Sequence, residues 1–359
     1  MKKLLALLII TSMTFTFAAC GGQSSTTGNT TTAEKTTAVE KTAEAEKTTT
    51  DDSKAYIMRI GTPTTNDPQV YEMGEFKRIL EEKTAGKISV ELYPSGQLGS
   101  NTQMLQGLQA GTIQALLEPT AFLGGFSSVV NVVDLPYFFK DVWTATDLLN
   151  GEGGNLLREY LGKKGIVTGS FYPYGDRITL TTTKIEKMED FKGKKIRVMG
   201  AKVLQEQFNS WGASGIPMDV PELYTALQQK TLDGLESAAQ FFQTGKYFEV
   251  AKYLLTEPKG AEVTIFMINK AWLEGLPEDL QKAVYAAAEE VRPLAVEYSK
   301  SSQEKAKKIM TDAGVEIVDA SADFQAQLIE KSKVVHENFL KDNPDAKEIY
   351  DQLKKAIAQ

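Results

Sequence analysis

Two arginines and one glutamate are the residues of this sequence best suited to bind a small polar molecule. Arg197 lies within the apolar run 196–199, Arg177 ends the segment 172–177, and Glu118 ends an apolar run before a proline. A guanidinium group can pair with both oxygens of a carboxylate. A carboxylate can accept hydrogen bonds from hydroxyl or amine groups, or act as a general acid or base.

Each of the three also has a purely structural interpretation. On a strand, the side chain of Arg197 faces opposite to both apolar neighbours. It then points into a cleft, lies exposed on an edge strand, or pairs with an internal acid. Arg177 either belongs to a pocket wall or forms a salt bridge with Asp176 or another nearby acid. For Glu118, no second carboxylate stands at a spacing that indicates acid–base catalysis.

Several classes of site are excluded by composition. The chain has one cysteine, Cys20, and one histidine, His336, which excludes disulfide frameworks, Cys/His zinc sites and Cys/His or Ser/His catalytic pairs. His336 falls in a helical pattern and is expected to be solvated. The glycine-rich segment 151–154 follows a predicted helix, so it does not indicate a dinucleotide site. The net charge of −7 argues against a nucleic-acid partner, and we expect no cofactor or metal.

The N-terminus has the features of a secretory signal over residues 1–19. Two lysines precede an apolar stretch that is too short for a membrane span. Ala18, Ala19 and Gly21 flank Cys20 as in the lipobox of bacterial lipoproteins, although Phe17 stands where leucine is usual. This predicts lipidation of Cys20 and attachment to a membrane. The alternatives are an ordinary signal cut nearby or an uncleaved anchor.

Residues 20–54 form a predicted flexible linker. Beyond Cys20 this stretch has no aromatic residue and only one branched aliphatic residue, Val39, so it cannot bury enough apolar surface to fold. Its flexible part would span roughly 30 to 35 Å, from the scaling of flexible chains.

From residue 56 onward, the pattern alternates between strand and helix. The chain has 359 residues, of which 42% are hydrophobic, and is therefore long enough to form two domains. The predicted fold is α/β with two lobes, mostly parallel sheets and a cleft between the lobes. A helix from about residue 276 to about 310 would be roughly 50 Å long, enough to cross more than one domain, with a kink or break expected at Pro293. The periodicity predicts strands at 58–60, 88–92, 113–117, 196–199, 263–268 and 315–318, and helices at 70–83, 142–149, 202–211, 222–229, 276–310 and from 321 onward.

Ligands in open α/β sheets bind beyond the carboxyl ends of the strands. Here those ends are 62–63, 118–119, 172–177 and 197–200. They add Tyr172 and Gly200 to the candidate binding residues.

The sequence resembles the solute-binding proteins of tripartite ATP-independent periplasmic (TRAP) transporters, the DctP-like family. The resemblance covers about residues 56–291 and more weakly the remainder. It rests on motifs that occur in the family's order and spacing: LYPSGQLG at 92–99, DLPYFF at 134–139, DFKGKKIRV at 190–198, PM at 217–218, ELYTALQ at 222–228 and DGLE at 233–236.

The resemblance implies a two-lobed binding protein that closes on a small organic acid and delivers it to a TRAP membrane permease. It implies that Arg197 pairs with the ligand's carboxylate and that Arg177 supports it. Glu118 matches an acid that contacts the ligand in some members. Three further residues would line the pocket: Val220, Ser237 and Phe241. Ser237 and Ala121 depart from the pattern of sialic-acid-binding members.

Family topology implies that the lobes interleave and that the long helix lies across both lobes. Lobe I would comprise residues 55–174 plus 263–302, and lobe II residues 175–262 plus 303–359. The protein would act outside the cytoplasm, anchored through Cys20. Two other functions stay open: a ligand sensor for a signalling partner, which would share the same cleft, and a carboxylate-based hydrolase.

Overall fold

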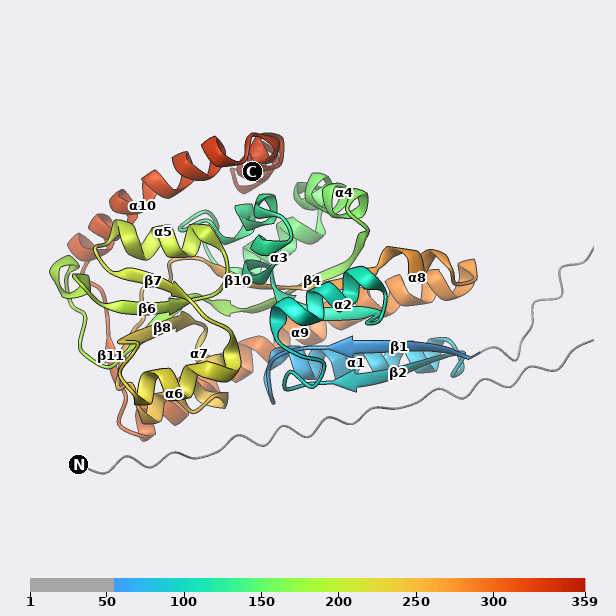
Figure 1. The fold of residues 1–359 in the computed structure, drawn as a ribbon, viewed down its shortest axis with the longest axis horizontal. Coiled ribbons are helices and arrows are strands. Elements are labelled where there is room, and N and C mark those ends of the chain that lie inside the picture. Colours follow the sequence, from blue (N-terminus) through green and yellow to red (C-terminus); the bar gives the residue numbers. More distant parts are fainter. Residues whose placement is uncertain (1–54, 359) are drawn as a thin grey trace, which may run out of the picture. The chain divides into compact units, whose positions relative to one another are not determined.

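Two β-sheets covered by helices form the two lobes of residues 55–358, the part of the chain that the computed structural model describes (Figure 1). The predicted signal, Cys20 and the linker 20–54 lie outside these residues. In lobe I the strand order is β2-β1-β3-β10-β4, and in lobe II it is β11-β9-β5-β8-β6-β7.

In each sheet one strand runs against the others. In lobe I, β10 pairs antiparallel with β3 and β4, whereas β1 pairs parallel with β2 and β3. In lobe II, β5 pairs antiparallel with β8 and β9, and the remaining pairs are parallel. The predicted mostly parallel α/β fold is therefore confirmed. The strands are β1 Tyr56–Gly61, β2 Ile88–Tyr93, β3 Ala115–Pro119, β4 Ile166–Asp176, β5 Ile178–Thr181, β6 Lys195–Val198, β7 Ser214–Pro217, β8 Gly234–Ser237, β9 Tyr253–Leu255, β10 Ala261–Asn269 and β11 Glu316–Val318.

Local sequence signals set the ends of the helices. The Asp67 side chain accepts a hydrogen bond from the backbone N–H of Val70 at the start of α1. Ser100 and Gln103 form a reciprocal capping box at the start of α2, which ends at Gly111 in the left-handed conformation that glycine favours. The helices are α1 Pro68–Lys83, α2 Asn101–Ala110, α3 Val142–Asn150, α4 Asn155–Lys163, α5 Lys202–Ser210, α6 Leu223–Gln228, α7 Ala239–Thr244, α8 Lys270–Glu274, α9 Glu278–Asp312, α10 Ala322–Asp342 and α11 Lys347–Ile357.

The long helix α9 contacts both lobes, as predicted. It packs against α1 and β4 of lobe I and against α7 of lobe II. The helix continues through Pro293 without a break, so the expected interruption does not occur. Its length of 35 residues corresponds to about 52 Å.

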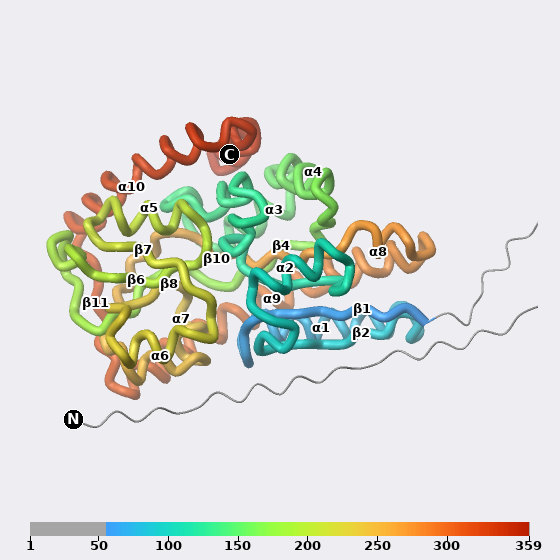
Figure 2. Tube along the Cα trace, in the orientation of Figure 1, coloured from blue at the N-terminus to red at the C-terminus, as the bar shows by residue number. Residues whose placement is uncertain are grey.

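The chain also crosses between the sheets at two adjacent places, near the centre of the trace in Figure 2. Arg177 alone separates β4 of lobe I from β5 of lobe II, and residues 256–260 lead from β9 back to β10. The two crossings are joined by backbone hydrogen bonds, from Arg177 N to Gly260 O (2.8 Å) and from Lys259 N to Arg177 O (3.1 Å). Any relative movement of the lobes therefore requires the backbone to bend at these crossings and α9 to shift against at least one lobe.

The C-terminal helices touch both lobes. Helix α10 packs against α5 of lobe II, whereas α11 packs against α3 and α4 of lobe I. His336 on α10 is half-buried, with Nε2 2.7 Å from the carbonyl oxygen of Pro136. The expectation of a solvated histidine is therefore wrong, because α10 faces the 136–139 loop. The residue limits of the two predicted lobes stay a prediction.

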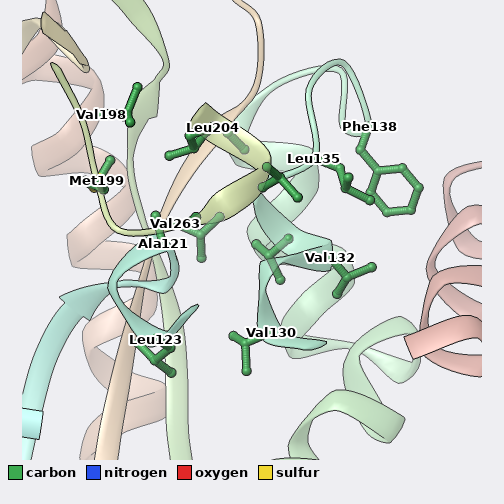
Figure 3. Close-up of a cluster of buried hydrophobic side chains, with 14 of the residues drawn as sticks. Ala121, Leu123, Val130, Val132, Leu135, Phe138, Val198, Met199, Leu204 and Val263 are labelled. Carbon is green, nitrogen blue, oxygen red and sulfur yellow. The ribbon is translucent and has the colours of Figure 1, made fainter. Parts of the chain in front are cut away.

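One apolar core joins lobe I to lobe II. Figure 3 shows side chains of the segment 121–138 gathered with Val198, Met199 and Leu204 of lobe II and with Val263 of β10. All the residues labelled there are buried. This core lies beside the ends of the strands where we expect the ligand.

Close packing where β4, α7 and α9 meet can be tested at Gly175. A Cβ atom there would lie 2.6 Å from the Cβ of Ala238 and 3.0 Å from Oε1 of Gln303. Gly175→Ala should lower the free energy of unfolding by about 1–3 kcal/mol, the range for overpacked sites, as measured by thermal or urea unfolding. Gly162→Ala is the control, because nothing lies within 4 Å of its Cβ position in helix α4. Equal stability of the two variants would contradict this packing.

Candidate functional site

A small cavity of about 10 Å³ lies between the lobes, at the carboxyl ends of the strands. Lobe I contributes Tyr174 of β4 and residues at or after the ends of β1 and β3, and Glu262 lies at the start of β10, where the chain crosses between the lobes. Lobe II contributes residues from β6, β8 and the segments after β6 and β7. The lining residues are Pro63, Thr64, Gln69, Pro119, Phe122, Tyr174, Arg197, Met199, Val220, Ser237, Phe241 and Glu262.

Arg197 is the cation of this cavity. It is 1% exposed, and its Nε donates to the carbonyl oxygen of Met218 (2.9 Å). Its guanidinium carbon lies 5.9 Å from the ring centre of Phe122 and 5.7 Å from that of Phe241, so one aromatic ring from each lobe flanks it.

No carboxylate among residues 55–358 forms a salt bridge with Arg197, and its Nη2 is buried there without a hydrogen-bond partner. Burial lowers the pKa of Arg197 from its ordinary value. A buried cation without a partner carries a large desolvation cost, and an anion entering the cavity would offset it.

Glu262 is the one acidic residue in the cavity wall. It is 2% exposed, and its Oε2 accepts a hydrogen bond from the Ser237 hydroxyl (2.7 Å). Burial raises the pKa of Glu262 to about 7. The register of β10 against β4 shifts between Glu262 and Val263, which leaves Tyr174 without a pairing residue. Such a bulge redirects side chains, and here both Glu262 and Tyr174 reach the cavity.

The loop after β1 supplies the polar wall of lobe I. The hydroxyls of Thr62 and Thr64 donate to Oε1 of Gln69 (2.6 and 2.9 Å), and Nε2 of Gln69 donates to Thr264 (3.3 Å). These groups are buried and hydrogen-bonded to one another, so Thr64 and Gln69 are held in place at the cavity.

Arg177 differs from Arg197 because acids surround it. Its Nη1 lies 3.0 Å from Glu236 and its Nη2 2.7 Å from Asp134, and all three side chains are almost fully buried. Its Nε donates to the carbonyl oxygen of Ala261 (3.0 Å). Burial alone would lower the pKa of Arg177, but Glu236 and Asp134 raise it above its ordinary value. Arg177 therefore holds the two crossings together.

The family to which the chain belongs follows from its similarity to known proteins. The family model DctP, described as bacterial extracellular solute-binding protein, family 7, matches residues 61–343. The C4-dicarboxylate-binding periplasmic protein DctP of Rhodobacter capsulatus is 33% identical over 265 residues, which cover 73% of this chain and 80% of that protein. The 2,3-diketo-L-gulonate-binding periplasmic protein YiaO of Escherichia coli is 29% identical, over 84% of this chain and 92% of its own length.

Solved structures agree. A TRAP periplasmic solute-binding protein from Desulfovibrio salexigens, with bound orotic acid, superposes with a TM-score of 0.80 at 31% identity, covering 84% of this chain and 99% of that one. The protein belongs to the DctP family of TRAP transporter solute-binding proteins. It is an extracytoplasmic binding protein and not an enzyme, so the hydrolase alternative is excluded.

For this DctP-family protein, four of the eight residues predicted from the sequence line the cavity: Arg197, Val220, Ser237 and Phe241. The other four lie outside its lining. Arg177 forms the ion pairs at the crossings between the lobes. Gly200, which follows the cavity residue Met199, is exposed to solvent. The Tyr172 hydroxyl donates to the carbonyl oxygen of Ala288 on α9 (2.8 Å).

Glu118, the fourth, is fully buried next to the cavity residue Pro119. Neither of its carboxyl oxygens has a hydrogen-bond partner among residues 55–358. Burial raises its pKa well above the ordinary value, and Asp219 of lobe II raises it further. The carboxyl group therefore faces the boundary between the lobes and favours its neutral form.

Sequence reasoning missed Gln69, Phe122 and Glu262, whereas Tyr174 lies in the segment 172–177 that the sequence proposed as a pocket wall. Glu262 could have been suspected, because it lies next to a predicted crossing between the lobes. Phe122 and Gln69 carry no signal in the sequence, since their positions depend on a short 3-10 turn and on a polar first turn of α1.

Residues 55–358 contain no cluster of three or more His, Cys, Asp or Glu side chains that could hold a metal ion. Within that same stretch, every helix is either too short or too polar to cross a membrane.

The structural role of Arg177 can be tested with Arg177→Met. The substitution leaves Glu236 and Asp134 buried without their cation, so the free energy of unfolding should fall by about 3–5 kcal/mol, measured by urea unfolding. Arg59→Met is the control, because the pair that Arg59 forms with Glu91 is about 40% exposed on both sides and its loss should cost at most about 1 kcal/mol. A similar, small loss in both variants would contradict this role.

Proposed function

We propose that this protein captures a small organic acid through a salt bridge between the ligand's carboxylate and Arg197, and delivers it to a TRAP permease. The observation that carries the proposal is the buried, unpaired guanidinium group of Arg197 in a cavity between two lobes. The names of relatives support the ligand class: orotic acid is bound to the Desulfovibrio protein, and C4-dicarboxylates are bound by the Rhodobacter protein.

Closure of the lobes makes the salt bridge strong. Phe122 comes from lobe I and Phe241 from lobe II, so both rings flank Arg197 only when the lobes are together. Exclusion of water then lowers the local dielectric and strengthens the attraction between guanidinium and carboxylate. The ligand favours closure by as much as it binds the closed state more tightly than the open one. The crossings around Arg177 and helix α9 form the hinge.

Beyond the family assignment, we propose that the protein is a lipoprotein. Cys20 would carry the lipid after removal of residues 1–19, and residues 20–54 would tether the binding domain to the membrane. The lobe limits 55–174 plus 263–302 and 175–262 plus 303–359 are part of the same proposal, with α11 in contact with lobe I.

Binding by Arg197 is tested with Arg197→Ala and Arg197→Lys. A thermal-shift screen of organic acids first finds a ligand, since a ligand at 100 times its Kd adds about 2.7 kcal/mol of stability. Calorimetry should then show binding weakened more than about tenfold in the alanine variant, with part of the affinity kept by lysine, which has the charge but not the planar fork. Unchanged affinity in both variants would refute the proposal.

The same residue allows a stability control. Arg197→Met removes a buried charge that has no acidic partner among residues 55–358, so the melting temperature of the unliganded protein should stay the same or rise. A marked fall would show that Arg197 holds the fold together, as Arg177 does.

Lipidation of Cys20 is tested by mass spectrometry of the protein from the membrane fraction. We expect a lipid-modified Cys20 at the mature N-terminus, and release of the Cys20→Ala variant from the membrane. A wild-type protein that starts elsewhere or carries no lipid would contradict the anchor. Loss of acid uptake in cells lacking the protein separates transport from a purely sensory role.

A further inference from the structure

We propose that the ligand is a monocarboxylate that carries several hydroxyl groups, and that Glu262 selects it by accepting hydrogen bonds from those hydroxyls and repelling a second carboxylate. The inference rests on the proposed function, because it takes Arg197 as the site of the single carboxylate. It narrows the class of organic acids to one kind.

The charges in the cavity wall are the first evidence. Among the lining residues, Arg197 and Glu262 are the only charged side chains. A neighbouring hollow shares Pro63, Thr64, Val220 and Phe241 with the cavity, and its lining contains no charged side chain. A dicarboxylate held by Arg197 would therefore place its second carboxylate against neutral groups or against Glu262.

No other nearby cation is placed to bind a second carboxylate of the ligand. Arg177 is occupied by Glu236 and Asp134. Lys259 is 2% exposed and lies outside the cavity lining, with burial lowering its pKa to about 8. Within the range 55–358, Glu262 forms no salt bridge, and its carboxylate accepts a hydrogen bond from the Ser237 hydroxyl. Its carboxyl group keeps acceptor capacity for a ligand.

The hydroxyl groups of the wall are the second, independent evidence. Three of them line the cavity, and each has its hydrogen directed at a group of the protein. Ser237 donates to Glu262 (2.7 Å), Thr64 to Gln69 (2.9 Å) and Tyr174 to Asp67 (2.9 Å). Their oxygens can still accept hydrogen bonds, but they have no second hydrogen to give.

The wall away from Arg197 therefore offers acceptors on both lobes. Hydroxyl groups of a ligand can donate to these acceptors, whereas a second carboxylate can only accept. A site built to bind hydroxyls rejects an analogue that lacks them, because its buried polar groups are then left without partners. Several separate acceptors match several hydroxyls better than the single ammonium group of an amino acid.

The test compares ligands of equal chain length on the full chain by calorimetry. D-gluconate is paired with adipate, and L-threonate with succinate, and L-glutamine is added as an ammonium-bearing acid. Burial raises the pKa of Glu262 to about 7. Glu236 raises this pKa further, whereas Arg177, Ser237 and Arg197 lower it. A buffer at about pH 8 therefore keeps Glu262 mostly ionised. We expect a hydroxy acid to bind at least about tenfold more tightly than its paired dicarboxylate.

Glu262→Gln keeps the shape of the side chain and removes the charge. It should weaken hydroxy-acid binding by more than about tenfold and narrow or reverse the preference over the dicarboxylate. Glu72→Gln is the matched control: Glu72 is also fully buried but lies on α1 outside the cavity lining, so its replacement should leave the preference unchanged. If Glu262→Gln fails to fold, the preference of the wild-type protein for hydroxy acids over dicarboxylates still tests the inference.

Tighter binding of succinate, adipate or L-glutamine, or an unchanged preference in a folded Glu262→Gln variant, would overturn the inference. If the tightest ligand is a dicarboxylate whose binding depends on Arg197, the inference fails while the proposed function stands. If none of the acids binds the wild-type protein, and the wider acid screen also finds no ligand, the proposed function fails as well.

Discussion

A guanidinium group buried without an acidic partner is the constraint on which the binding site depends. Arg197 is 1% exposed, and among residues 55–358 its one hydrogen bond runs from Nε to the carbonyl oxygen of Met218. Burying a charge is costly unless it is paired. The two flanking rings and the carbonyl of Met218 orient the group but do not neutralise it. Under the proposed function, an incoming anion would recover the free energy that this arrangement costs the unliganded protein.

Arg177 shows how the same residue type serves the opposite purpose. It is equally buried, but Glu236 and Asp134 satisfy its charge at the point where the chain crosses between the lobes. The ion pairs of Arg177 hold the two crossings together. The guanidinium group of Arg197 in the cavity, in contrast, has no acidic partner among residues 55–358. In this structure, the charge that holds the crossings together is thus separate from the unpaired charge in the cavity.

The sequence was sufficient to predict the fold class and the long helix. Alternation of strands and helices indicated two α/β lobes, and the run from about residue 276 indicated a long helix. That this helix contacts both lobes was implied only by the family resemblance. For Arg197 and Arg177, residue type and spacing left a binding and a structural interpretation open. Only the tertiary structure separates them, because Glu236 and Asp134 are 59 and 43 residues away from Arg177 in the chain. Glu262 escaped prediction, because a shift in strand register that the sequence does not reveal directs it to the cavity.

The most direct test is a crystal structure of the protein with an organic acid found by thermal-shift screening. The account predicts that the lobes are closed and that both oxygens of one carboxylate lie about 2.7–2.9 Å from the guanidinium nitrogens of Arg197. A ligand carboxylate bound to Arg177 or Lys259 instead, with Arg197 out of contact with it, would contradict the account.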